Sequence, residues 1–189
     1  MSQVPDILTD RLRLRGFQPD DAEDVFRYAS DPAVLLYTTG CTPQRVDESR
    51  AFVDGLIHKP AGAYAWAVCL KSALRVIGAV EFGVGDGTEG SIDYALAKEH
   101  WNKGLMTEAC RAVLDWGFCS HAELERVTTS AVVVNRASTR VMEKCGMRFL
   151  RNVTAKWDKL TEPVELAVYT IDRERWNAQR TSQEGSRRA

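Results

Sequence analysis

A short polar loop, residues 101–106, carries residue types suited to binding a phosphate group. Residues 92–109 read IDYALAKEHWNKGLMTEA, in which a predicted strand leads through the loop into an amphipathic helix. The first backbone amides of a helix have no partner within it and lie at the positive end of its dipole, so they bind anions. Gly104 lets the backbone approach an anion closely because it has no Cβ, and Lys103 adds positive charge. The structural alternative is a glycine that only makes the turn into the helix, since neither a P-loop sequence nor a GxGxxG sequence occurs.

A second polar turn follows about 30 residues further along the chain. The β-branched residues of 126–134 predict a buried strand, and a helix begins directly after it. Asn135 caps this helix, Ser138 lies in its first turn, and Gly146 stands at its end. Local structure alone explains each residue, but the two turns together, in this order, favour a functional interpretation.

The elements that position these turns follow from hydrophobic periodicity. Strands are predicted at residues 7–17, 64–70, 75–84, 91–96, 126–134, 147–153 and 164–171, and helices at 19–31, 42–57, 104–119 and 135–145. This order predicts one α/β domain over residues 1–176, a mixed sheet with helices packed on it. Residues 177–189 are polar without an apolar period, so we expect a flexible tail.

Composition excludes several classes of protein. The chain has 189 residues and a formal net charge of −1, so no strong positive field attracts it to nucleic acid or to a membrane surface. No apolar stretch is long enough to cross a bilayer, and residues 1–10 do not resemble a signal peptide. The five cysteines form no CxxC pair and the three histidines lie far apart, so we expect reduced thiols, no metal site and a cytoplasmic location.

These stretches resemble the GNAT superfamily of acyl-CoA N-acyltransferases. Its usual pattern is Gln/Arg-x-x-Gly-x-Gly/Ala at the start of a helix. Residues 101–106 resemble the form with Trp at the first position, which belongs to the subgroup of the ribosomal-protein N-terminal acetyltransferases RimJ and RimL. The resemblance includes the sequence LTDRLRLR of residues 8–15, NRAS of 135–138 and EKCGMRF of 143–149, and it spans about residues 8–171.

The resemblance implies a mixed, mostly antiparallel sheet in which two parallel strands, 91–96 and 126–134, splay apart between flanking helices. It implies acetyl-CoA as co-substrate, with the pantetheine arm in the gap and the pyrophosphate on the loop amides. The residues implied in cofactor binding are Leu96, Trp101, Asn102, Lys103, Gly104, Leu105, Met106, Thr107, Asn135 and Ser138. Met106 replaces the small residue usual in the family, and we expect its side chain to point away from the anion.

The general base does not follow from the resemblance, because Ser91 and residues 156–158 stand where relatives carry a Glu. Ser91, Asp93 and Ala95 share one face of their strand, and Asp93 is the only acid among them. We expect Asp93 to accept the amine proton through water that Ser91 holds, and Ser138 to donate to the leaving sulfur. The alternative is that Asp93 only pairs with a nearby base.

The expected activity is direct transfer of the acetyl group of acetyl-CoA to a primary amine, on a protein or peptide N-terminus or a small molecule. Alternatives are a succinyl-CoA or other acyl-CoA transferase and a non-catalytic acyl-CoA-sensing domain. We expect acceptor contacts from residues 33–59 and 158–163, with Glu81 among the acids that would attract an amine. Neither nucleic acid nor membrane is an expected partner, and a homodimer is left open.

Overall fold

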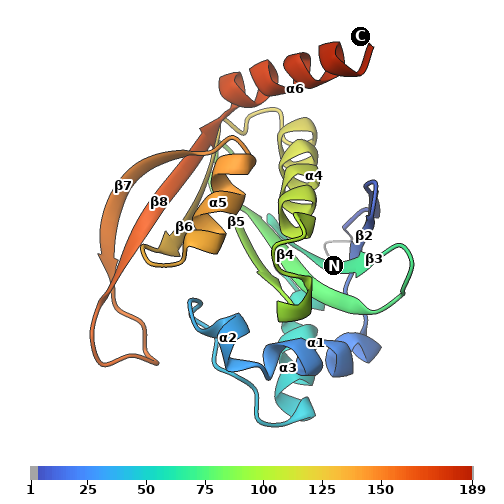
Figure 1. Ribbon diagram of the computed structural model, residues 1–189, viewed down its shortest axis with the longest axis vertical. Helices are drawn as coiled ribbons and strands as arrows, with labels where there is room; N and C mark the ends of the chain where they lie inside the picture. Colours follow the sequence, from blue (N-terminus) through green and yellow to red (C-terminus); the bar gives the residue numbers. More distant parts are fainter. Residues whose placement is uncertain (1–3, 189) are drawn as a thin grey trace.

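An eight-stranded sheet is the framework of the protein, seen in a computed structural model that describes the backbone of residues 4–188 and the side chains of 4–181 (Figure 1). The strands are β1 (Ile7–Leu8), β2 (Leu12–Gly16), β3 (Ala63–Leu70), β4 (Val76–Val84), β5 (Glu89–Leu96), β6 (Arg126–Val132), β7 (Arg148–Ala155) and β8 (Val164–Asp172). Their order is β1-β2-β3-β4-β5-β6-β8-β7, and every pair except β5–β6 is antiparallel. The predicted mixed, mostly antiparallel sheet is confirmed.

The helices cover this sheet unevenly. They are η1 (Pro19–Asp21), α1 (Ala22–Ala29), α2 (Pro32–Leu35), α3 (Val46–Ile57), η2 (Lys98–His100), α4 (Leu105–Ser120), α5 (Arg136–Lys144) and α6 (Arg173–Arg188). Helices α1, α2 and α3 gather at one end of the molecule and α6 lies at the other (Figure 1). Among the helices of the described residues, none is long and apolar enough to span a membrane.

The two parallel strands pair only where they begin. β5 and β6 pair through Glu89–Arg126, Gly90–Val127 and Ser91–Thr128, and then they separate. Among the described residues, the second half of β5 therefore has hydrogen-bonded strand partners only on its β4 side. The expected splay between the two strands is confirmed, and it leaves backbone groups of β5 facing the gap.

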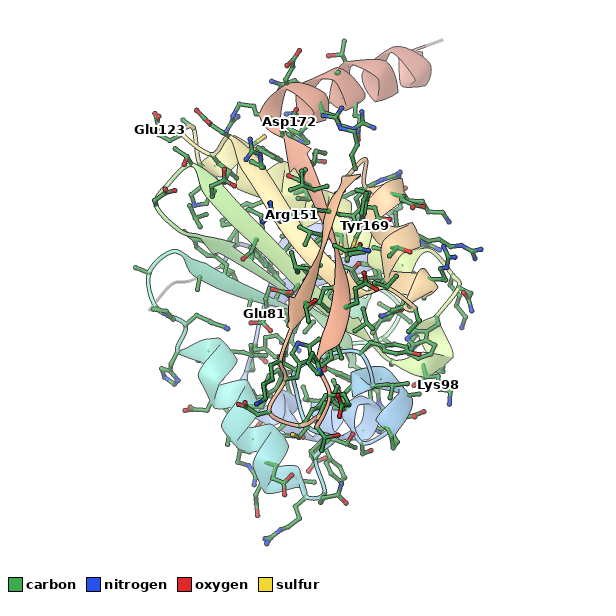
Figure 2. The ribbon with its side chains drawn as sticks, turned by 90° about the vertical axis from the view of Figure 1, so that its left-hand side faces the viewer. Glu81, Lys98, Glu123, Arg151, Tyr169 and Asp172 are labelled. Atoms are coloured by element: carbon green, nitrogen blue, oxygen red, sulfur yellow. The ribbon has the colours of Figure 1, made fainter. Side chains whose placement is uncertain are left out.

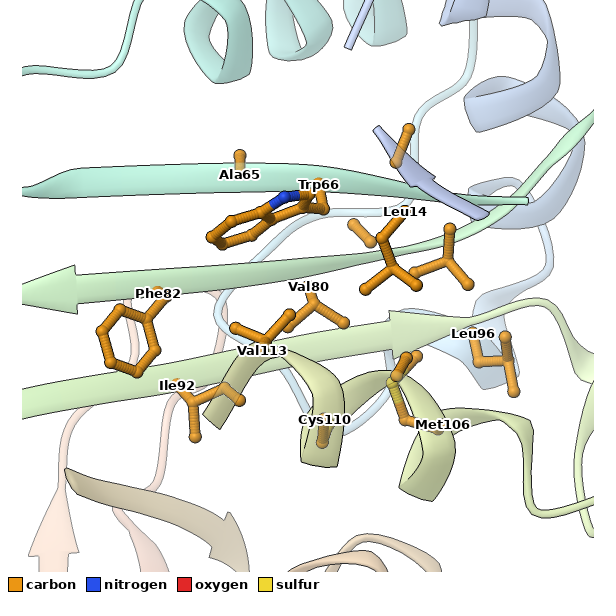
Figure 3. Close-up of a cluster of buried hydrophobic side chains, with 14 of the residues drawn as sticks. Leu14, Ala65, Trp66, Val80, Phe82, Ile92, Leu96, Met106, Cys110 and Val113 are labelled. Atoms are coloured by element: carbon orange, nitrogen blue, oxygen red, sulfur yellow. The ribbon is translucent and has the colours of Figure 1, made fainter. Parts of the chain in front are cut away.

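Helix α4 packs tightly on the sheet and so fixes the position of its own start. Its residues Met106, Cys110 and Val113 are buried together with side chains of β2, β3, β4 and β5 (Figure 3). Close approach depends on Gly117, because a Cβ there would overlap the ring of Phe82. A helix held this firmly presents its first amides at a fixed place beside the end of β5.

Three segments differ from the sequence prediction. Residues 7–17 form the hairpin β1–β2 instead of one strand, because the amide of Thr9 donates to Leu12 O at 3.0 Å and turns the chain. The short helix α2 was not predicted. Residues 177–188 continue helix α6, where we expected a flexible tail; Trp176 anchors this helix by donating to Asp115 at 2.7 Å. Residue 189 lies outside the described residues, and the domain boundary at 176 stays a prediction.

Candidate active site

The loop before α4 has an unusual backbone. Gly104, the N-cap of α4, has a φ of 73°, and Asn102 has a φ of 58°. Asn102 is the only non-glycine residue with positive φ among the described residues. Left-handed conformations cost energy for residues with a Cβ, and such residues cluster at functional sites. Gly104 is exposed, and a Cβ there would meet only Arg11 Nη2, at 3.6 Å.

The first amides of α4 have no partner in the described part of the chain. The first helical hydrogen bond runs from Glu108 N to Gly104 O at 3.1 Å, and no side chain caps the helix. The amides of Leu105, Met106 and Thr107 are therefore left for another acceptor. All three residues are buried. An anion fits this position, because unpaired amides, the helix dipole and the open space at Gly104 coincide.

The β1–β2 turn holds the loop in place. Arg11 donates to Glu108 through Nε at 2.7 Å and through its backbone amide at 2.8 Å, and its Nη1 donates to Lys103 O at 2.8 Å. Thr9 Oγ1 donates to the same carboxylate. Burial would raise the pKa of Glu108, but these hydrogen bonds outweigh it and lower the pKa. Sequence reasoning missed this function of Thr9 and Arg11, which are far from the loop along the chain.

Trp101 ties the loop to the end of β5. Its Nε1 donates to Leu96 O at 2.7 Å. We expected the pantetheine arm to bind backbone around Leu96, and the structure gives the Leu96 carbonyl a donor from within the chain. A carbonyl oxygen has two lone pairs and can accept a second hydrogen bond.

On the helix side of β5, Tyr94 reaches the start of α5. Its hydroxyl lies 3.0 Å from Ser138 O and 2.9 Å from Ser138 Oγ. Asn135 Oδ1 accepts from Ser138 N at 3.2 Å and so caps α5, as its position in the sequence predicts. The structure thus brings Ser138 to the diverging half of β5. Tyr94 was not among the candidate residues, because its alternation with Ile92 and Leu96 is typical of a core position.

On the opposite side of β5, two acids face each other. Asp93 pairs with Glu81 across the β4–β5 register, and Lys59 Nζ lies 2.6 Å from Glu81 Oε2. Desolvation raises the pKa of Asp93 and the charge of Glu81 raises it further, while Lys59 opposes the change. Asp93 is nevertheless exposed, as is Ser91 two residues before it, so its carboxylate can exchange protons with water. In the view of Figure 2, Glu81 lies above the helices α1 and α3.

The alternative that Asp93 only pairs with a base is not what the structure contains. Within the described residues, Asp93 has no ion pair and no side-chain hydrogen bond, and the nearby Lys59 is bound to Glu81 instead. The structure also does not bring Asp93 and Ser138 onto the same face. They lie on opposite sides of β5, beside the gap that opens toward β6.

Comparison with known proteins decides the family. Residues 11–148 match the family model described as an acetyltransferase (GNAT) domain. The chain belongs to the GNAT acetyltransferase family. This GNAT protein is an acyl-CoA-dependent N-acetyltransferase, which transfers an acetyl group from acetyl-CoA to an amine.

Several relatives of this GNAT protein match most of its length. It is 31% identical over 183 residues to the uncharacterized N-acetyltransferase YnaD of Bacillus subtilis, covering 90% of this chain and 99% of YnaD. The crystal structure of a GNAT-family acetyltransferase from Bacillus anthracis has 29% identity and a TM-score of 0.79, with 90% of this chain and 99% of that chain covered. The ribosomal L7/L12 alpha-N-protein acetyltransferase RimL has 17% identity and a TM-score of 0.74 over 89% of this chain and 94% of RimL, which shows the same fold.

The two segments that we expected to contact the acceptor meet in this GNAT protein. Lys159, in the β7–β8 loop, donates to Leu35 O at 2.8 Å and to Gly40 O at 3.0 Å, both after the start of α2. Desolvation lowers the pKa of Lys159. Tyr37 and Cys41, which lie in the segment 33–59, are exposed, whereas Trp66 is fully buried in the core.

Among the described residues of the enzyme, no group of three or more side chains could hold a metal ion. All five cysteines are free.

Proposed function

We propose that this N-acetyltransferase transfers the acetyl group directly to a primary amine, on a peptide N-terminus or a small molecule, through the gap between β5 and β6. The observation that supports this most strongly is the arrangement around β5. A hydroxyl pair, Tyr94 and Ser138, lies on one side, and the exposed carboxylate of Asp93 lies on the other. Donor and acceptor would then meet at the diverging half of the strand.

For the donor, the loop at the start of α4 is the pyrophosphate site. The amides of Leu105, Met106 and Thr107 would hold the phosphate oxygens, with Asn102, Lys103 and Gly104 around them. The pantetheine arm would run along the gap past Trp101 and Leu96 toward Asn135 and Ser138. Support comes from the unpaired amides and from the space above Gly104.

On the side of the amine substrate, Asp93 accepts the proton. An amine near pH 7 is mostly protonated and must lose a proton before it attacks a thioester. The raised pKa of Asp93 brings its basicity nearer to that of the amine than an ordinary carboxylate would have. A water held by Ser91 would carry the proton. Asp93, Glu81 and Lys59 together carry two carboxylates and one ammonium group, and this excess of negative charge would attract the ammonium group of the acceptor.

The transfer step then balances without an enzyme nucleophile. The nitrogen lone pair forms the C–N bond, the C–S bond breaks, and its electron pair leaves on the sulfur as a thiolate. Nitrogen loses two protons between the ammonium ion and the amide. The first passes through water to Asp93 before attack, and the second is released to solvent water as the C–N bond forms. Ser138 would donate a hydrogen bond to the thiolate, which leaves readily and takes a proton from water on release. Binding both reactants together supplies much of the rate.

The acceptor enters from the side that Lys159 closes, between the β7–β8 loop and the segment after α2. Both a peptide N-terminus and a small amine fit the charge of this side, which carries Asp93 and Glu81. We place the reaction in the cytoplasm, which the free cysteines of the enzyme favour.

A thiol-release assay tests this function. Acetyl-CoA and succinyl-CoA are each offered with a panel of peptides and polyamines. We expect turnover with acetyl-CoA and at least one primary amine. Faster turnover with succinyl-CoA would indicate that succinyl-CoA, and not acetyl-CoA, is the preferred donor. Tight acetyl-CoA binding without thiol release from any acceptor would favour a sensing domain.

A further inference from the structure

The hydroxyl protons of Tyr94 and Ser138 can form hydrogen bonds in two different arrangements. The Tyr94 hydroxyl has one proton and two neighbours, Ser138 O at 3.0 Å and Ser138 Oγ at 2.9 Å. If Tyr94 donates to the carbonyl, Ser138 must donate to the tyrosine oxygen. If Tyr94 donates to Ser138 Oγ, the serine proton is released and can point elsewhere.

The position and the pKa of Tyr94 restrict its hydroxyl to these two hydrogen-bond arrangements. It lies on β5 beyond Ser91–Thr128, the last pair with β6, and it crosses to the first turn of α5. Burial raises the pKa of the Tyr94 phenol far above its ordinary value, against a lowering by the hydrogen bond with Ser138. The phenol therefore keeps its proton at every physiological pH and acts as a hydrogen-bond donor.

We propose that Tyr94 is a positioning residue that switches the Ser138 hydroxyl between two hydrogen bonds, so that it donates to the leaving sulfur only when a thiolate forms there. This inference rests on the proposed function, which places the sulfur beside Ser138. Without ligand, Ser138 donates to Tyr94 and Tyr94 donates to the Ser138 carbonyl.

During transfer the two donors turn together. As the C–S bond breaks and negative charge collects on sulfur, the Ser138 proton turns toward it. Tyr94 then donates to Ser138 Oγ in place of the carbonyl. No proton leaves either hydroxyl, so the electrons balance as in the transfer step above. A hydroxyl that accepts a hydrogen bond becomes a better donor, so Tyr94 strengthens the bond from Ser138 to the thiolate.

The test compares Tyr94→Phe, Ser138→Ala and the double variant with a matched control. Tyr169→Phe is the control, because Tyr169 on β8 (Figure 2) also donates to α5, to Glu143 at 3.2 Å, and makes no hydrogen bond to Ser138 within the described residues. Tyr94→Phe keeps the ring and its packing. We expect it to lower kcat by about 3- to 10-fold, the range of one indirect hydrogen bond, with the KM for the amine unchanged. Tyr169→Phe should leave kcat unchanged.

The double variant separates positioning from a structural role. If Tyr94 acts through Ser138, adding Tyr94→Phe to Ser138→Ala should change kcat by less than about 2-fold, since the effects of groups that act as a unit do not add. Equal kcat for the wild type and Tyr94→Phe would overturn the inference and leave the acetyltransfer intact. Multiplicative losses in the double variant would also overturn it.

A second measurement does not depend on turnover. The thiol of bound CoA is titrated by its ultraviolet thiolate absorbance in each protein. Its pKa should be lower when CoA is bound to the wild type than when bound to Tyr94→Phe or Ser138→Ala, and Tyr169→Phe should match the wild type. This result without thiol release from any amine would uphold the Tyr94 inference while the proposed function failed. A bound thiol that titrates identically in all four proteins, or no CoA binding, would overturn the inference.

Discussion

Replacing Gly104 by valine tests whether the start of α4 binds the pyrophosphate. The residue has a φ of 73°, where a side chain is strained, but the space around it is open. A residue with a Cβ in the left-handed region costs about 1–2 kcal/mol. For a protein of this size that lowers the Tm by roughly 2–8 °C, so the variant should still fold.

The loss of affinity should be larger than the loss of stability. A valine side chain at the N-cap would stand where the anion must approach the amides of α4. Losing two hydrogen bonds to a charged group, at about 1.5–3 kcal/mol each, weakens binding by at least about 100-fold. Calorimetric titration with acetyl-CoA measures this loss, and a thermal scan measures the stability.

Gly87 provides the matched control. It lies in the turn between β4 and β5 with a φ of 101°, and a Cβ there would meet no atom within 4 Å. Gly87→Val therefore introduces at least as much backbone strain as Gly104→Val does, without changing the loop before α4. We expect normal acetyl-CoA affinity in Gly87→Val. Unchanged affinity in Gly104→Val would refute the placement of the site, and equal losses in both variants would assign the effect to strain alone.

Three further predictions test other parts of the enzyme. Asp93→Asn should remove the acidic limb of the pH profile of kcat/KM and cost more activity than Ser138→Ala; an unchanged limb would place the base elsewhere. The pKa of Asp93 is raised in the folded protein, so its negative charge disfavours folding at neutral pH. Asp93→Asn should therefore also raise the Tm at pH 7. At a pH below the pKa of an unfolded Asp, the substitution should leave the Tm unchanged. Arg173→Ala should lower the free energy of unfolding by about 2–3 kcal/mol, because the guanidinium donates to three backbone carbonyls around the end of α4. The control Arg126→Ala removes only an exposed ion pair and should lower it by less than about 1 kcal/mol. Denaturant titrations measure both changes. Lys159→Met should change the KM for peptide acceptors more than the KM for acetyl-CoA, and steady-state kinetics showing the reverse would remove the β7–β8 loop from the acceptor side.

Hydrophobic periodicity predicted the elements that carry a long apolar pattern. Helix α4 and the strands β3 to β6 were found within a few residues of their observed bounds, because their inward faces pack on one common core. The cap at Asn135 and the turn glycine at Gly104 were also predicted, since each depends on local backbone geometry. These features depend on residues that are neighbours in the chain, which is why one sequence suffices to find them.

Contacts between segments that are distant in the chain could not be predicted from the sequence. The turn at Thr9 and Arg11 binds Glu108, about 100 residues away, and nothing in its local sequence indicates that partner. Helix α6 forms on a polar sequence because Trp176 docks against α4, a tertiary contact without a repeating pattern. Tyr94 was missed for a similar reason, because periodicity shows which face a side chain occupies but not what it meets there.

The period of a strand explains how one element can serve both substrates. Successive side chains of β5 point to opposite faces, so Asp93 and Tyr94 are neighbours in the chain but act on different sides of the sheet. Tyr94 meets the start of α5 on the side of the proposed donor, and Asp93 meets Glu81 on the side of the proposed acceptor. The pairing of β5 with β6 ends at Ser91, just before these two residues, so the sheet opens where both sides are needed. Moving Asp93 by one position would place the carboxylate beside the departing thiolate, where like charges repel, and would leave the acceptor amine without its base.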